Sequence, residues 1–189
     1  MLFRSYDVGR ADDGCAYIVM ELLEGETLRE RLRHESPLPE PVALDYTRQL
    51  AAALAAAHQA GIIHRDIKPE NIFIARDEAV RAGERIKLLD FGIAKLTEKG
   101  QAEALTQTGD IVGTPKYMSP EQCRGTGSYD ARSDLYAIGC VLFEMLCGQP
   151  PFVSEFPGDI IFDHIGTAPP AVSSLRDGIS PAVEDLVAQ

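Results

Sequence analysis

The sequence is short of positive charge, has few cysteines and contains no long apolar run. Its four cysteines show neither C-x-x-C spacing nor a zinc-type cluster with histidine, which favours a reduced, cytoplasmic setting. No segment reaches the roughly 18–20 apolar residues that a membrane-spanning helix requires. Arg4, Asp7 and Arg10 interrupt any signal-peptide-like stretch. We therefore expect no membrane contact within this chain.

The charge balance argues against another class of partner. Lysine and arginine total 18 against 29 aspartates and glutamates, which gives a net charge of −11. The phosphates of nucleic acids and anionic lipids repel such a surface, and the sequence has no Lys/Arg cluster to bind them. We therefore expect no nucleic-acid partner. A length of 189 residues with 45% hydrophobic residues is typical of a single globular domain.

Hydrophobic periodicity predicts a mainly helical chain with short hairpins. The predicted strands span residues 2–8, 16–21, 72–74 and 86–89, and 16–21 is expected to be buried. The predicted helices span residues 28–33, 40–60, 133–146 and 180–189. Thr27 would cap the first helix, and Ser133 would cap the third, which should be buried nearly all round. Residues 97–114 are polar and aperiodic, which indicates a long loop.

Four motifs carry the chemistry. HRDIKPEN occupies residues 64–71, and DFG follows a predicted strand at 90–92. GTPKYMSPE occupies residues 113–121, and Ser133-Asp134 opens the apolar helix. Any one of these motifs alone would be weak evidence, but together, in this order, they are specific.

Their order and spacing resemble eukaryotic-type (Hanks-type) serine/threonine protein kinases of the bacterial kind, over essentially the whole chain. The resemblance implies an α+β, protein-kinase-like fold with a mainly helical C-lobe and a remnant of the N-lobe sheet. Residues 1–23 would form the end of the N-lobe and the hinge, and residues 24–189 the C-lobe without its last helices. It also implies ATP and Mg²⁺ as cofactors and proteins as substrates. It leaves open a dimer for autophosphorylation and a membrane tether outside this chain.

The resemblance assigns the catalytic roles residue by residue. Asp66 would accept or orient the proton of the substrate hydroxyl, and Lys68 would hold the transferring phosphate. Asn71 and Asp90 would supply the hard oxygen ligands that Mg²⁺ prefers. Lys68 followed by proline is similar to the Ser/Thr pattern and differs from that of tyrosine kinases.

Further positions follow from the same resemblance. The nucleotide-binding candidates are Met20, Glu21, Leu23 and Phe73, with Met20 as gatekeeper. The structural candidates are His64, Arg65, Phe91, Glu121 and Asp134, with Asp134 bracing the catalytic-loop backbone. Thr106 and Thr108 are candidate activation-loop phosphosites that would dock on Arg65, although they fit an ordinary polar loop equally well. Thr114 would instead shape the substrate pocket.

Several family features have no counterpart in the sequence. No Gly-rich loop, strand lysine or helix glutamate precedes the hinge, so we expect the isolated chain to be inactive and of low stability. No arginine follows the last predicted helix, so Glu121 would lack its ion-pair partner. Two alternatives remain: a non-catalytic kinase-like binding module or truncated remnant, and a small-molecule phosphotransferase. The long segment ending in Ser119-Pro120-Glu121 disfavours the phosphotransferase.

Overall fold

The structure is a computed structural model that describes residues 5–11, 13–80, 83–89, 115–125, 127 and 129–188. The strands are β1 (Ser5–Arg10), β2 (Ala16–Met20), β3 (Gly25–Thr27), β4 (Ile72–Arg76) and β5 (Glu84–Leu88). The α-helices are α1 (Leu28–His34), α2 (Glu40–Gln59), α5 (Pro120–Cys123), α6 (Ala131–Cys147), α7 (Pro157–Gly166) and α8 (Pro181–Val187). Short 3₁₀ turns are η1 (Pro69–Asn71), η2 (Pro115–Tyr117) and η3 (Val172–Ser174).

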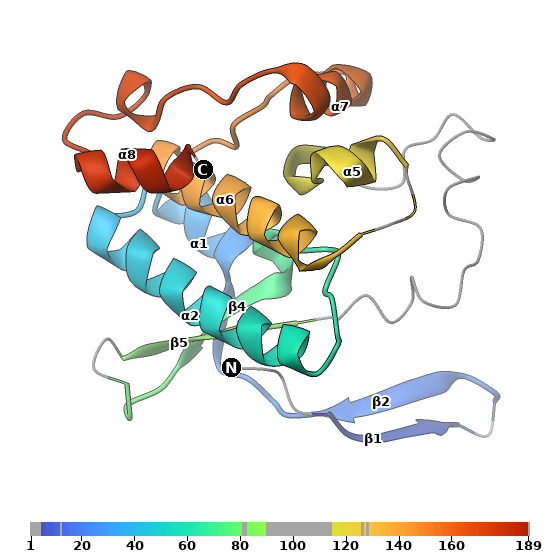
Figure 1. Ribbon diagram of the computed structural model, residues 1–189. Coiled ribbons are helices and arrows are strands. Elements are labelled where there is room, and N and C mark those ends of the chain that lie inside the picture. The colour runs from blue at the N-terminus through green and yellow to red at the C-terminus, as the bar shows by residue number, and fades with distance from the viewer. Residues whose placement is uncertain are drawn as a thin grey trace.

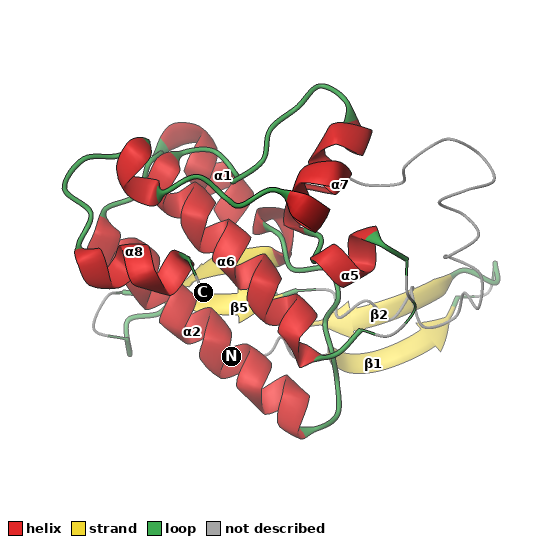
Figure 2. Cartoon of the chain, turned by 45° about the horizontal axis from the view of Figure 1, so that its top comes forward, coloured by secondary structure: helices red, strands yellow, loops and turns green. Residues whose placement is uncertain are grey.

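The core lies between α2, α6 and the small sheet β3–β4–β5. α2 packs beside α6 and against β5, and α8 covers the end of the pair (Figures 1 and 2). Eleven of the 17 residues of α6 are buried, but Leu135 is 56% exposed, so the helix is less completely buried than the sequence predicts. The largest fully buried side chains include Leu50, Leu54, Ile86, Phe143 and Leu146.

The start of α1 follows the sequence prediction. The Thr27 hydroxyl accepts a hydrogen bond from the Glu30 amide at 3.2 Å, and the Glu30 carboxylate accepts one from the Thr27 amide at 2.8 Å. This capping box satisfies two donors at the helix end. The predicted cap on Thr27 is therefore confirmed.

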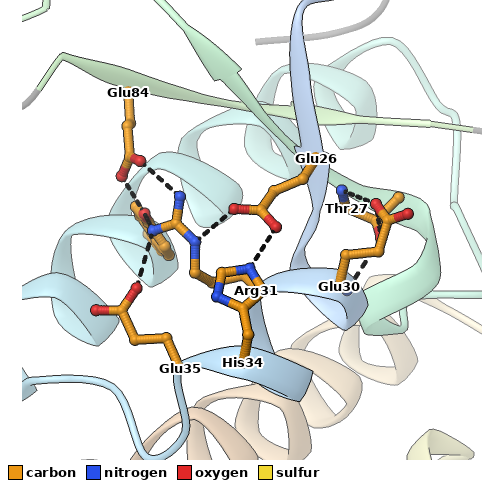
Figure 3. Close-up of polar contacts among 8 residues, drawn as sticks. Glu26, Thr27, Glu30, Arg31, His34, Glu35 and Glu84 are labelled. Carbon is orange, nitrogen blue, oxygen red and sulfur yellow. Dashed lines mark hydrogen bonds and ion pairs between the residues drawn. The ribbon is translucent and has the colours of Figure 1, made fainter.

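One arginine joins α1 to both edges of the three-stranded sheet (Figure 3). Arg31 Nε donates to Glu26 of β3 at 2.7 Å, and Arg31 Nη2 donates to Glu84 of β5 at 2.8 Å. His34 lies 2.7 Å from the other oxygen of Glu26. Because β4 lies between β3 and β5, these contacts clamp the helix across the sheet.

The start of α6 differs from the prediction. The helix begins at Ala131 and is capped by Asp130, whose carboxylate accepts a hydrogen bond from the Arg132 amide at 2.8 Å. Ser133 is therefore not the cap: it lies inside the helix, where its hydroxyl donates to Glu121 at 2.5 Å. Ser and Asp both favour the cap position, and the sequence offered one of each within four residues.

The strands form two separate antiparallel sheets. β4 pairs with β3 and with β5, so that Ile74 stands opposite both Glu26 and Ile86. β1 and β2 form a two-stranded hairpin that extends to one side of the helical body (Figure 1). The predicted burial of the second strand is wrong: Ile18 is 50% exposed and Val19 44% exposed. A two-stranded hairpin has no second layer of its own to cover its apolar side chains.

All four cysteines are free thiols, and Cys140 is buried. Within the described residues, no helix combines the length and the apolar character needed to cross a bilayer.

Candidate active site

The loop of residues 64–71 runs from the end of α2 to β4, and a side chain of α6 anchors its backbone. The Asp134 carboxylate, which is 1% exposed, accepts the backbone N–H of His64 at 2.9 Å and that of Arg65 at 2.8 Å. His58, at the end of α2, lies 2.7 Å from the same carboxylate through Nε2. One buried side chain thus fixes two consecutive peptide groups of the loop.

Arg65 has a backbone conformation that non-glycine residues rarely adopt. Its φ is 64°, in the left-handed region that costs an L-residue roughly 1–2 kcal/mol. Its amide is bound by Asp134, and its carbonyl accepts a hydrogen bond from the Gln122 side chain at 3.0 Å. Its buried Nε has no hydrogen-bond partner among the described residues. These contacts hold the turn that presents the next residue, Asp66.

The contacts of His64 define its tautomer. Nε2 lies 2.8 Å from the Leu89 carbonyl oxygen, which can only accept, so Nε2 carries the proton. Nδ1 then accepts the Asp66 amide N–H at 3.3 Å. The fully buried ring therefore connects the loop of residues 64–71 to Leu89, just after β5.

Asp66, Lys68 and Asn71 meet in one small polar cluster. Asn71 Nδ2 donates to the Asp66 backbone oxygen at 2.8 Å and to Asp66 Oδ2 at 3.0 Å. Lys68 Nζ lies 2.9 Å from the same Oδ2. The Asp66 and Lys68 side chains remain 30% and 36% exposed. The arrangement orients a carboxylate beside a cation while leaving both accessible to a substrate.

The chemistry of Asn71 fits a cation ligand. Its amide nitrogen is occupied by Asp66, so the amide oxygen is the group that can face a metal ion. The second candidate ligand, Asp90, lies outside the described residues. Within the described part of the chain, no group of three His, Cys, Asp or Glu side chains is placed to hold a metal.

The candidate nucleotide-binding residues lie on β2, on β4 and in the segment of residues 21–24 after β2. Met20 ends β2 and is 49% exposed, while Phe73 stands on β4 opposite Lys87. Lys87 Nζ lies 2.5 Å from the Glu21 carboxylate, which ties the segment after β2 to β5. Residues 21–24, with Leu23 among them, line a cavity of about 310 Å³ together with parts of β4 and β5. None of its described lining residues belongs to the loop of residues 64–71.

Glu121 is held by hydrogen bonds from neutral groups. Burial would raise the pKa of this carboxyl, but hydrogen bonds from Ser133, from its own backbone and from Ser119 lower it below the ordinary value. The Ser133 hydroxyl of α6 donates to it at 2.5 Å, a contact that the sequence did not indicate. The remaining candidates, Phe91, Thr106, Thr108 and Thr114, lie outside the described residues.

Sequence reasoning missed several supporting residues. His58, Gln122 and Arg29 gave no motif signal, because each acts through a long-range contact. Glu144 gave one: it is the single acidic residue of the apolar stretch from Leu135 to Cys147. A lone acid in a buried helix predicts a partner elsewhere in the fold.

The fold and the site are those expected of a protein kinase, and comparison with known proteins agrees with this class. The model of the protein kinase domain family matches residues 3–182, and the chain belongs to this family. The prediction of a Hanks-type, bacterial-like kinase with an α+β fold is thereby confirmed.

The relatives are bacterial enzymes. The chain is 41% identical over 185 residues to the serine/threonine-protein kinase PknB of Mycobacterium leprae, a match covering 96% of the chain and 28% of that protein. It is 43% identical over 186 residues to the serine/threonine-protein kinase pkn3 of Myxococcus xanthus, covering 96% and 33%. It is 41% identical over 183 residues to the serine/threonine-protein kinase PknL of Mycobacterium tuberculosis, covering 97% and 43%. The chain thus spans less than half the length of these relatives.

Proposed function

We propose that this chain carries the catalytic loop of a protein serine/threonine kinase, which transfers the γ-phosphate of ATP to serine and threonine hydroxyls of proteins. The observation that supports this most directly is the cluster of Asp66, Lys68 and Asn71 on a loop fixed by Asp134. Phosphoryl transfer needs little covalent help from the protein, because catalysis depends mainly on positioning and on charge neutralisation.

The residues divide the work as follows. The Asp66 carboxylate orients the substrate hydroxyl and receives its proton as the hydroxyl oxygen attacks the γ-phosphorus and the bond to ADP breaks. Lys68 steadies the negative oxygens of the transferring group. Asn71, with Asp90, would hold Mg²⁺, which supplies neutralising charge when bound. His64 and Asp134 keep the loop backbone in place.

The nucleotide would lie between two parts of the chain. One is the segment of residues 21–24, which follows β2, and the other is strand β4. Backbone groups of Glu21 and Leu23 would bind the adenine edge, Phe73 would lie beneath the ring and Met20 would act as gatekeeper. The Glu21–Lys87 ion pair supports this placement because it ties the segment to the sheet that carries Phe73.

Regulation by phosphorylation forms part of the proposal. Phosphate on Thr106 or Thr108 would dock on Arg65, whose buried Nε has no partner among the described residues. Thr114 would shape the substrate pocket. Phe91 would control the direction in which Asp90 points. We place this chemistry in the cytoplasm, with protein substrates and a dimer for autophosphorylation.

The test recovers the protein from its own cells with an antibody raised against this chain. It is incubated with labelled ATP, Mg²⁺ and dephosphorylated casein. The Asp66→Asn and Asp130→Asn variants, each introduced at the chromosomal gene, are recovered and assayed in the same way. Asp130 is a matched control because it is an exposed helix cap and asparagine caps equally well. We expect phosphoserine and phosphothreonine from the wild type and Asp130→Asn, and a loss of about 10²-fold or more in Asp66→Asn. Equal labelling by Asp66→Asn, or phosphotyrosine alone, would refute the proposal. Nucleotide binding without transfer would favour a kinase-like binding module.

A further inference from the structure

Arg29 of α1 binds three partners that lie far apart in the sequence. Its Nε donates to Glu70 Oε1 at 2.8 Å, and its Nη1 donates to Glu144 Oε1 at 2.8 Å. Its Nη2 donates to the Tyr117 hydroxyl at 2.5 Å. These partners belong to η1, α6 and η2. Only the planar guanidinium fork provides three donors in such fixed directions.

Two of these partners close a triangle with Arg29. The Tyr117 hydroxyl, which accepts from Arg29, donates to Glu144 Oε2 at 2.5 Å. Glu144 is only 4% exposed, and a buried carboxylate without a cation would be costly. Burial alone would lower the pKa of Arg29, but hydrogen bonding to Glu144 and the other acidic neighbours raises it. The contacts of Arg29 with Glu144 and Tyr117 are therefore explained by stability, because they neutralise and hydrogen-bond the buried Glu144 carboxylate.

The third partner needs another explanation. The Glu70 side chain is 47% exposed, and an ion pair at such a position contributes little to stability. Glu70 lies in η1, between Lys68 and Asn71 of the catalytic cluster. Tyr117 lies in η2, just before α5, and Gln122 of α5 binds the Arg65 carbonyl. Arg29 therefore contacts the catalytic loop and also the segment that borders it.

We propose that Arg29 is a positioning residue for the protein substrate. Through Glu70 and Tyr117 it holds the catalytic loop and the segment of residues 115–122 in a fixed mutual placement. A protein that presents its hydroxyl to Asp66 must lie across groups bordering this loop, so their placement sets the substrate's orientation. Arg29 does not line the cavity beside residues 21–24, near which the nucleotide is proposed to lie. The inference rests on the proposed function.

The experiment compares four proteins, each recovered as in the test above. Arg29→Lys keeps the charge but cannot reach three partners with one ammonium group. Tyr117→Phe removes a single hydroxyl and leaves both ion pairs of Arg29. Arg48→Lys is the matched control, because Arg48 forms a comparable ion pair with Asp45 while its side chain is 71% exposed. KM and kcat are measured separately for casein and for ATP, with the melting temperature of each protein.

We expect Arg29→Lys and Tyr117→Phe to lower kcat/KM for casein about tenfold, equivalent to about 1.4 kcal/mol. KM for ATP should stay within about twofold of the wild type, and Arg48→Lys should match the wild type. Wild-type kinetics in Arg29→Lys would overturn the inference. So would parallel losses for casein and ATP that follow the folded fraction, because these would show a structural role only. If Asp66→Asn retains activity, the proposed function itself fails. That outcome can be told apart from the two results that would overturn only the role of Arg29.

Discussion

Replacing Asp134 by asparagine tests how the catalytic loop is held. The carboxylate accepts the amide N–H groups of His64 and Arg65 and lies 2.7 Å from His58 Nε2. An asparagine of the same size keeps one acceptor oxygen, but its NH₂ group faces a donor on the other side. At least one buried backbone N–H then loses its acceptor.

The magnitude follows from these contacts. A buried donor left unsatisfied costs about 1–3 kcal/mol, and hydrogen bonds to a charged group are worth about 1.5–3 kcal/mol. We expect Asp134→Asn to lose about 2–4 kcal/mol of unfolding free energy. At about 2–4 °C per kcal/mol for a chain of this size, the melting temperature should fall by about 5–15 °C. Arg65 would also be released from its left-handed conformation, so activity should fall further than the folded fraction.

The assay is thermal and urea unfolding of this chain followed by circular dichroism. Phosphorylation of casein is measured on the proteins recovered from their own cells, at a temperature where both are folded. Asp130→Asn serves as the control, because it changes the same residue type four positions earlier in the chain, at the exposed cap of α6. It should shift the melting temperature by no more than about 2 °C. Equal stability of Asp134→Asn and Asp130→Asn would refute the reasoning that Asp134 holds the loop.

Two other predictions concern the small sheet. Hydrogen bonds from His34 and then Arg31 hold the pKa of Glu26 below its ordinary value of 4.5 (Figure 3). A depressed carboxyl pKa stabilises the fold above the unfolded value, and this is lost as the pH falls through the folded value. Acid unfolding should therefore begin below about pH 4.5, and Glu26→Gln should melt lower than wild type at pH 7 by a margin that narrows below pH 4.5. At Gly25, where φ is 146° and a Cβ would lie 2.0 Å from a β4 carbonyl oxygen, alanine should cost about 2–3 kcal/mol in urea unfolding. Gly14→Ala, in open space with φ of 86°, should cost about 1 kcal/mol, and equal losses would contradict the steric argument.

The helical body could be predicted from the sequence because its signals are local. The Ala-rich run of α2 and the Thr27 capping box of α1 each lie within a few residues of the element they define. The start of α6 was misplaced because Asp130 and Ser133 both satisfy the cap chemistry. Only the fold shows that Ser133 is engaged by Glu121. The exposure of β2 could not be read from its composition, since burial of a strand depends on which layers pack against it.

The site divides in the same way. Asp66, Lys68 and Asn71 were predicted together because they share one contiguous motif, and the structure brings them into one cluster. Arg29 and His58 were not, because they reach the site across 41 and 76 residues, to Glu70 and to Asp134. No local pattern encodes such contacts.

The two acids of α6 explain how this loop can be both fixed and accessible. The loop buries His64, Ile67, Pro69 and Asn71, but the side chains of Asp66 and Lys68 stay 30% and 36% exposed, as the proposed function requires. Its anchors must therefore be polar groups supplied by a rigid element. Asp134 lies in the first turn of α6, where the helix dipole favours negative charge. Glu144 lies at the opposite end, where the dipole disfavours it, so this carboxylate requires Arg29. Arg29, the cation that neutralises Glu144, thereby also lies next to Glu70 of the proposed catalytic loop.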